Sequence, residues 1–309
     1  MVSHFNVWHL FRMSPVWQRT SVLLLILAVL AVGPASVLIR LAAAPPITVA
    51  FYRMTIASLA IGAIVLFRNR TDLAGIDRQA FVRSMIAGVL LAVHFGTWIS
   101  SLSYTSVVNS VLIVTTQPIW AALLGIWYLR ERIHATSFAA IALALVGVAI
   151  ISGGNPIPGG MKGDILALIG AIMAASYLVV GRQVRRTVST LGYVLIAYST
   201  AAVCLGIWGL IVQTPLAGLS GTSWMWITLA ALGPSVIGHT LYNRGLKDFS
   251  AHAVATTILG GETIVATVLA ALVLSEYPSA WAYLGAIPVA AGVVWTLSLE
   301  RNRVLADEV

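Results

Sequence analysis

The chain has 309 residues, of which 59% are hydrophobic and only 9% are charged, whereas soluble domains carry roughly 25% charged residues. This composition excludes a water-soluble fold. The formal net charge is +8, but the basic residues lie between apolar blocks rather than in one patch with interleaved aromatic residues, so no nucleic-acid partner is expected.

The apolar blocks have the length that a membrane-spanning helix requires. About 20 apolar residues, at about 1.5 Å each, cross the roughly 30 Å of hydrocarbon in a bilayer. The sequence divides into ten such segments, and we therefore predict an all-α integral membrane protein. The predicted transmembrane helices are residues 20–42, 47–67, 81–102, 105–129, 135–152, 163–184, 190–213, 223–245, 250–274 and 279–299.

The first segment also has features of a signal peptide, since Arg12 and Arg19 precede an apolar run at 22–31. The apolar character continues as far as Leu41, however, which gives a length that spans a bilayer. We therefore predict that this segment is retained as the first transmembrane helix.

The basic residues between the segments indicate the orientation. Fifteen of the eighteen Lys and Arg residues fall on one side, and that side is expected to be cytoplasmic. Both termini are then cytoplasmic, and we predict a multi-pass protein of the cell inner membrane. Arg40, Arg53 and Lys162 are the exceptions. Arg40 and Arg53 lie near the outer ends of their helices, where their side chains are expected to snorkel to water; gating of an outer vestibule is the alternative.

The two halves of the chain are weakly similar at an offset of 145 residues. The offset pairs Arg53 with Tyr198, Gly88 with Gly233, His94 with His239, Gln117 with Glu262, Ala121 with Ala266, Glu131 with Glu276 and Gly147 with Gly292. Because each half has an odd number of helices, five, the second half enters the membrane from the opposite face. We predict two inverted-topology repeats of five helices, an architecture typical of secondary transporters.

This repeat divides the chain into five parts. They are a cytoplasmic N-terminal segment at 1–19, a first five-helix repeat at 20–152, a periplasmic linker at 153–162, a second five-helix repeat at 163–299 and a cytoplasmic tail at 300–309.

A motif recurs at the end of each half. In the first half, the segment LIVTTQPIWAALLGIWYLRERI contains Pro118 and Glu131 and is followed by a helix with Gly147 and Val148 near its end. The second half repeats the pattern with Glu276, Gly292 and Val293, but Thr263 replaces the proline. Over nearly its whole length the chain resembles the paired EamA domains of the drug/metabolite transporter superfamily.

The resemblance implies a ten-helix carrier of small molecules. Members of the superfamily carry amino acids, other metabolites and drugs, and the chain looks most like the amino-acid exporters, including aromatic amino acid exporters. Export as the direction of transport is implied by the resemblance alone. An exporter of drugs or other organic metabolites is the alternative.

Glu262 is the first candidate for the substrate site. It lies about twelve residues into the ninth segment, near the middle of the membrane, where an ionised carboxylate costs on the order of 3 kcal/mol unless it is paired or faces water. It is expected to bind a substrate ammonium group or to carry a proton. A hydrogen bond to a neighbouring helix is the alternative.

His94 and His239 are further candidates, because they occupy equivalent positions deep in the third and eighth segments. Histidine titrates near pH ~6.5, within the range of a proton-coupled carrier; a buried structural histidine with satisfied hydrogen bonds is the alternative. One helical turn away lie Trp98 on the first of these segments and Tyr242 and Asn243 on the second. These groups can stack on a substrate or form hydrogen bonds with it; anchoring of the aromatic residues at the membrane interface is the alternative.

The fourth and sixth segments complete the predicted site. Pro118 is expected in the middle of its helix, where it frees an upstream carbonyl group beside Thr116 and Gln117 for a hydrogen bond to the substrate; a kink that serves only packing is the alternative. Tyr177 and its neighbour Ser176 lie in the middle of the sixth segment, and Ser36 follows Pro34 in the first. Each could complete the cavity wall; hydrogen bonds between helices are the alternative. The predicted hinges are Pro34, Pro118, Gly260 and Gly261.

Other classes of function find little support in the sequence. There is no His-Glu-x-x-His motif and no phosphate-binding Gly-x-x-x-x-Gly-Lys-Ser/Thr loop, so neither an enzyme nor an ATP-driven pump is expected. Cys204 is the only cysteine, and no metal or cofactor is predicted. The expected partners are a small-molecule substrate and membrane lipid, with the protein acting as a monomer by alternating access. A channel or a receptor is the remaining alternative.

Overall fold

The computed structural model describes residues 16–68, 73, 75–104, 110, 113–114, 116–153, 160–274 and 280–307. Every regular element within them is a helix, which confirms the all-α prediction. The elements are α1 (Val16–Val32), α2 (Ala35–Ala42), α3 (Pro46–Arg68), α4 (Arg78–Ser101), α6 (Gln117–Leu129), α7 (Ala135–Gly153), α8 (Met161–Val184), α9 (Thr190–Ile211), α10 (Gly221–Ala230), the π-helix η3 (Ala231–His239), α11 (Thr240–Gly245), α12 (Ala251–Leu274) and α13 (Ala280–Asp307).

Several predicted features lie outside the described residues. They are most of the N-terminal segment 1–19, the start of the fourth span at 105–109, most of the linker at 153–162, the last two residues of the tail, and Glu276.

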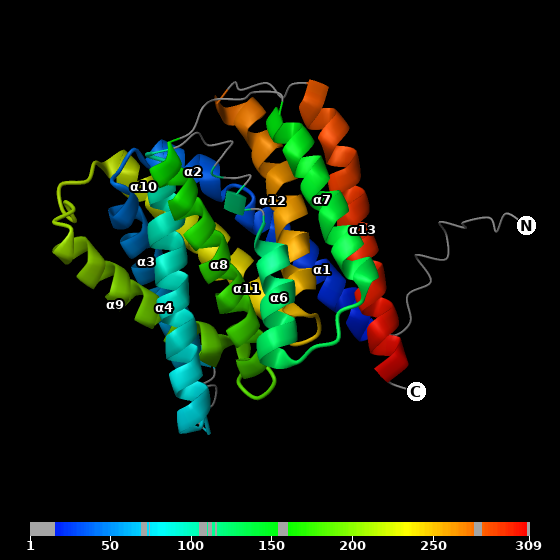
Figure 1. Cartoon of the computed structure of the whole chain (residues 1–309). Helices are drawn as coiled ribbons and strands as arrows, with labels where there is room; N and C mark the ends of the chain where they lie inside the picture. The colour runs from blue at the N-terminus through cyan, green and yellow to red at the C-terminus, as the bar shows by residue number, and fades with distance from the viewer. Residues whose placement is uncertain are drawn as a thin grey trace, which may run out of the picture.

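The described helices group into ten spans when α1 is joined with α2, and α10 with η3 and α11. Among the described residues, seven spans are long and apolar enough to cross a membrane, judged by length and composition alone. Figure 1 shows the helices packed side by side in one bundle. Large apolar side chains cover its outside, for example Phe67 with 92% and Trp127 with 78% of its surface exposed, as expected of a surface that faces lipid.

The first span is interrupted at Gly33 and Pro34. Helix α1 ends at Val32 and α2 begins at Ala35, because proline has no N–H group with which to continue the hydrogen-bond ladder. The break lies at one of the predicted hinges; whether the chain moves there stays a prediction.

Pro118 has a different position from the one that we predicted. It lies in the first turn of α6, directly after the N-terminal Gln117, and not in the middle of a helix. Proline is favoured there because the first N–H groups of a helix have no partner within the helix. Within the described residues, Pro118 therefore does not interrupt a continuous helix.

The eighth span contains a π-helix, which the sequence did not predict. Residues Ala231–His239 form η3 around Pro234, where the missing N–H of proline disturbs the α-helical ladder. Short π-helical stretches occur frequently at functional sites. This one leads directly to His239 and Tyr242.

Gly260 and Gly261, two of the predicted hinges, do not interrupt their helix; whether the chain bends there during transport stays a prediction. Helix α12 continues through both positions. A Cβ atom at Gly260 would overlap the side chain of Val293, and one at Gly261 would overlap that of Val29. These glycines therefore let α12 approach α13 and α1 closely.

The last helix is longer than predicted. Helix α13 continues from Ala280 to Asp307, so the predicted tail at 300–309 is helical over most of its length.

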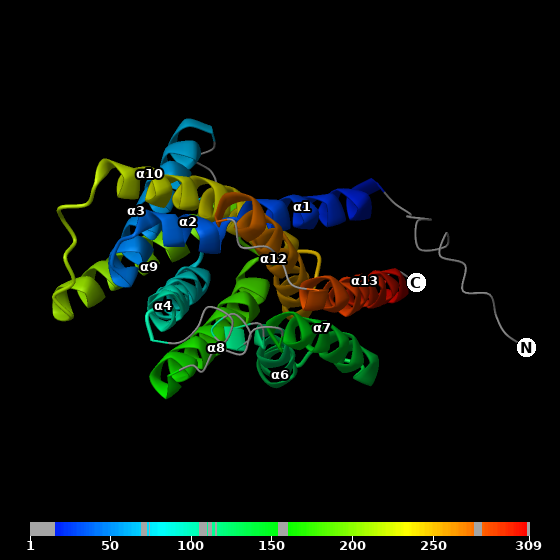
Figure 2. The same cartoon turned by 90° about the horizontal axis from the view of Figure 1, so that it is seen from above.

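The contacts between the helices have the two-fold pattern of the repeat. When each helix is replaced by its counterpart in the other half, the contact between α4 and α8 corresponds to the contact of η3 and α11 with α1. In the same way, the contact between α6 and α8 corresponds to the contact between α12 and α1. The pairs α3 with α9, α6 with α12 and α7 with α13 map onto themselves. Figures 1 and 2 both show α7 and α13 side by side at one end of the bundle. The architecture is the two-repeat fold that the sequence predicted.

Candidate functional site

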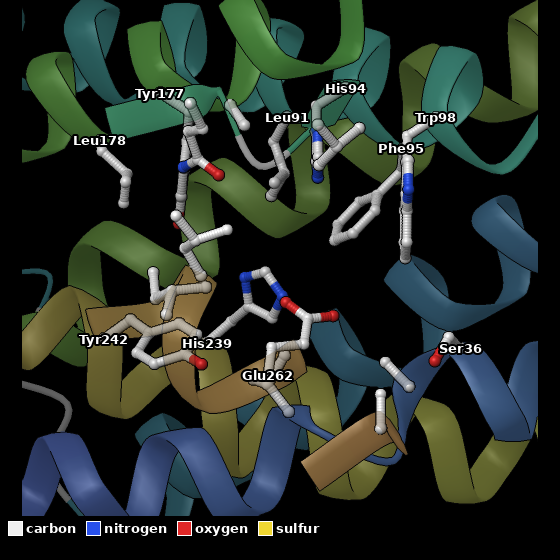
Figure 3. A pocket seen from close by; sticks show the side chains of 18 of the residues that line it. Ser36, Leu91, His94, Phe95, Trp98, Tyr177, Leu178, His239, Tyr242 and Glu262 are labelled. Atoms are coloured by element: carbon white, nitrogen blue, oxygen red, sulfur yellow. The ribbon is translucent and has the colours of Figure 1, made fainter. Parts of the chain in front are cut away.

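A cavity of about 100 Å³ lies between the two halves, within the bundle. Its walls come from α1, α2, α3, α4, α6, α8, η3, α11 and α12. Seven of the nine predicted substrate-binding residues line it: His94, Trp98, Gln117, Tyr177, His239, Tyr242 and Glu262. Figure 3 shows most of these side chains around the cavity, together with Ser36 and Phe95.

Helix α4 provides one wall of the cavity. His94 Nδ1 lies 2.9 Å from the carbonyl oxygen of Gly170 on α8, and a carbonyl oxygen only accepts hydrogen bonds. Nδ1 therefore carries the proton, and Nε2 of the neutral ring remains as an acceptor. The His94 ring is parallel to the indole of Trp98, with centroids 5.9 Å apart. Trp98 Nε1 is buried without a hydrogen-bond partner in the described structure.

Glu262 lies on the opposite wall, on α12, and points into the cavity toward His239 (Figure 3). The His239 ring packs edge-on against Phe95 at 5.5 Å and against Tyr242 at 5.7 Å. The hydroxyl group of Tyr242 is buried without a hydrogen-bond partner among the described residues. This wall therefore combines a carboxyl group, an imidazole and a phenol.

Arg53 also lines the cavity, contrary to our prediction that it snorkels to water. It lies seven residues, about two turns, inside α3, and none of its surface is exposed to solvent. Its Nε donates to Ser235 Oγ at 2.7 Å, and its guanidinium carbon lies 4.5 Å from the centre of the Phe95 ring. The guanidinium group is thus held in place from η3 and α4. The signal in the sequence was a charged residue in an apolar helix, which favours a functional role by itself.

Two predicted substrate-binding residues do not line the cavity. Thr116 donates to the carbonyl of Ile113 and accepts from Trp120 Nε1, so its hydroxyl group is used at the start of α6. Asn243 is fully buried below the cavity and donates to the Tyr177 hydroxyl at 2.6 Å and to the His239 carbonyl at 2.7 Å. Asn243 therefore positions two cavity residues instead of facing a ligand.

We call the face of the bundle with the connections α6–α7, α8–α9 and α11–α12 the basic face; it lies at the bottom of Figure 1. Buried polar contacts close the bundle there. Arg182 donates to the carbonyls of Leu246 and Lys247 at 2.6 and 2.7 Å and lies 3.6 Å from Glu131. Arg185 donates to the Asn243 carbonyl at 3.1 Å. These contacts join the ends of α6, α8 and α11.

No group of three or more His, Cys, Asp or Glu side chains that could hold a metal ion occurs among the described residues.

The EamA-like transporter family model matches the chain twice, at residues 19–153 and 161–298. The chain belongs to the EamA-like transporter family. The first copy of the motif, with Pro118, lies in the first range, and Gly292 of the second copy lies in the second range. This membership makes the protein a multi-pass membrane transporter, and the cavity between the halves is the candidate transport site.

Two other transporters are similar to the chain along most of their length. The chain is 22% identical to Uncharacterized transporter YxxF of Bacillus subtilis (strain 168) over 82% of its residues and 81% of that protein. It is 23% identical to Uncharacterized transporter YyaM of the same organism over 81% of its residues and 83% of that protein. A solved crystal structure matches 92% of this chain and 98% of its own with a TM-score of 0.77 at 18% identity, which shows the fold.

Proposed function

We propose that this protein is a secondary active transporter that exports amino acids or similar small metabolites across the bacterial inner membrane. The cavity between the halves carries the proposal, because it combines the charged groups Arg53 and Glu262 with aromatic walls. An amino acid has one group of each charge and an apolar body. The cavity therefore complements all three parts of such a substrate.

The proposed mechanism is alternating access. The polar contacts of Arg182 and Arg185 close the bundle at the basic face, below the cavity. In a carrier with inverted repeats, the two halves rock so that one side closes as the other opens. We assign the basic face to the cytoplasm, which gives cytoplasmic termini, and a monomer suffices because one chain forms the whole cavity.

Export of an organic cation or a drug is the second candidate. Glu262 together with Trp98, Tyr177 and Tyr242 would suit a cationic aromatic molecule. Arg53 opposes this assignment, because it adds a positive charge to the same cavity. The two candidates are therefore distinguished by whether the transported substrate is a zwitterion or a cation.

Replacement of Glu262 with glutamine is expected to lower amino-acid exchange at least about tenfold, because the partner of the substrate ammonium group is lost from a buried site. The measurement is counterflow of labelled amino acids into proteoliposomes that are preloaded with unlabelled compound, with and without a pH gradient. Asp248→Asn is the control, since Asp248 pairs with the half-exposed Arg244 away from the cavity.

Wild-type protein that exchanges no amino acid, in vesicles shown to contain folded protein, would refute amino-acid transport. Saturable exchange of organic cations under those conditions would support the second candidate. Flux that does not saturate would instead indicate a channel.

A further inference from the structure

The guanidinium group of Arg53 is fixed, but it is only partly used. Its Nε donates to Ser235, and its guanidinium carbon lies 4.5 Å from the centre of the Phe95 ring. The two terminal nitrogens, Nη1 and Nη2, are buried and have no hydrogen-bond partner in the described part of the chain. Arg53 nevertheless lines the cavity. A binding group with two unused donor nitrogens therefore stands at the cavity wall.

Such an arrangement selects for a particular chemistry. Terminal N–H groups of arginine form parallel, charge-assisted hydrogen bonds with the two oxygens of a carboxylate. Leaving a buried charged donor without a partner is costly, more so than for a neutral group. A carboxylate that enters the cavity would satisfy both nitrogens at once.

Glu262 limits what else the ligand can be. It lines the same cavity as Arg53, and its carboxyl group carries a negative charge when it is ionised. Two negative charges on the ligand would leave one of them repelled by Glu262. A ligand with a carboxylate at Arg53 and an ammonium group near Glu262 balances both charges of the protein.

We propose that Arg53 is the residue that binds the substrate α-carboxylate, that Glu262 binds the α-ammonium group, and that the substrate is a zwitterionic α-amino acid. This assignment rests on the proposed function and specifies its substrate class. It separates two roles: Arg53 and Glu262 select the backbone of the amino acid, while Phe95, Trp98 and Tyr242 contact its side chain.

Ser235 has a positioning role in this arrangement. Its hydroxyl group accepts the hydrogen bond from Arg53 Nε, and it lies within the π-helix η3. The hydroxyl group of Tyr198 donates to the carbonyl of Ser235 at 3.2 Å, which holds η3 in turn. Removing the Ser235 hydroxyl group leaves the charge of Arg53 in place, but the guanidinium group is then no longer held in one orientation by this hydrogen bond.

The test uses matched ligands, namely leucine, phenylalanine and tryptophan, each as the free acid, the α-carboxamide and the deamino acid. Binding to purified wild-type protein in detergent is measured by thermal stabilisation, and exchange is measured in proteoliposomes. We expect the free acid to bind at least about 30-fold more tightly than the carboxamide, which corresponds to the low end of the effects at buried charge pairs.

Three variants assign the effect to Arg53. Arg53→Gln is expected to remove the preference for the acid over the carboxamide, and Arg53→Lys to restore it in part, because lysine keeps the charge but loses the paired donors. Ser235→Ala is expected to weaken the preference while the protein stays folded. Arg78→Gln at the exposed start of α4 is the control and should leave the preference intact.

The two proposals fail separately. Wild-type protein that exchanges amino acids and their carboxamides equally well would overturn the assignment of Arg53 and leave amino-acid transport standing. Absence of exchange for every amino acid would overturn the proposed function. In that case, the binding measurement on the wild-type protein still tests the role of Arg53. Equal stabilisation by the acids and the carboxamides would refute a carboxylate site, even if Arg53→Gln does not fold.

Discussion

Replacement of Arg182 with methionine is expected to open the cavity to the basic face. Arg182 donates to the carbonyls of Leu246 and Lys247 and lies next to Glu131, so it joins three helix ends across the two halves. Methionine fills a similar volume but provides no donor. Breaking one partner of a buried ion pair typically costs about 3–5 kcal/mol, which is enough to shift an equilibrium between two conformations by at least about 100-fold.

The accessibility of a cavity residue measures this shift. Cys204 is the only cysteine, so Ser36→Cys in a Cys204→Ala background places a single thiol at the cavity wall. A membrane-impermeant maleimide is then applied from the basic face. We expect slow labelling with Arg182 present and labelling at least about tenfold faster in Arg182→Met.

The control is Arg244→Met. Arg244 pairs with Asp248 at the same face, but its side chain is 38% exposed, and pairs of this kind contribute little to stability. Its labelling rate should stay near that of the parent. Equal labelling of the Arg182→Met protein and its parent would show that Arg182 does not close the basic face.

Replacement of Gly292 with valine is expected to disrupt folding more than any substitution in the cavity. A Cβ atom at Gly292 would lie 2.7 Å from the carbonyl oxygen of Ala140, and one at its repeat partner Gly147 would lie 2.6 Å from that of Gly285. Both contacts are with backbone atoms, which cannot move aside as a flexible side chain can. Helices α7 and α13 would have to separate, at a cost of about 3 kcal/mol or more.

Thermal unfolding in detergent and the fraction of monodisperse protein test this expectation. We predict a fall in the melting temperature on the order of 5 °C or more for Gly292→Val, and for Gly147→Val as well. Gly221→Val is the control, because a Cβ atom at Gly221 would meet nothing within 4 Å. Unchanged melting temperatures would contradict close contact of α7 with α13.

The sequence predicted the class of fold because hydropathy and charge act over whole segments. The ten apolar blocks and the basic loops follow from the solvent properties of the bilayer, and the repeat follows from matching residues at a constant offset. The breaks within helices depend on local contacts, and these were predicted less well. Pro34 does lie at a break, but Pro118 begins a helix and Pro234 lies in a π-helix. Proline is thus found at three different kinds of position: at a helix break, at a helix start and within a π-helix.

Gly260 and Gly261 give a related example, because helix α12 continues through both of them. Glycine occurs both where a helix breaks and where two helices pack closely. The sequence does not distinguish these uses, because the deciding atoms belong to Val29 and Val293, far away in the chain.

Seven predicted substrate-binding residues line the cavity, and the sequence pointed to them because a polar or aromatic group in an apolar helix is itself a signal. That they bind a substrate stays a prediction. Arg53 was missed because its position near a helix end suggested that its side chain reaches water. Its burial depends on Ser235 and Phe95, which belong to other helices. Only the packing of the bundle brings these three residues together.

The two-fold pattern of contacts is the pattern of an isologous dimer, in which each substitution appears twice. A dimer of identical five-helix chains could therefore not hold a single arginine or a single glutamate at its centre. In the joined chain, the repeat partner of Arg53 is Tyr198, and that of Glu262 is Gln117. Covalent fusion of the halves thus allows one cation and one anion to share a cavity, so that a ligand with two unlike ends has a single preferred direction.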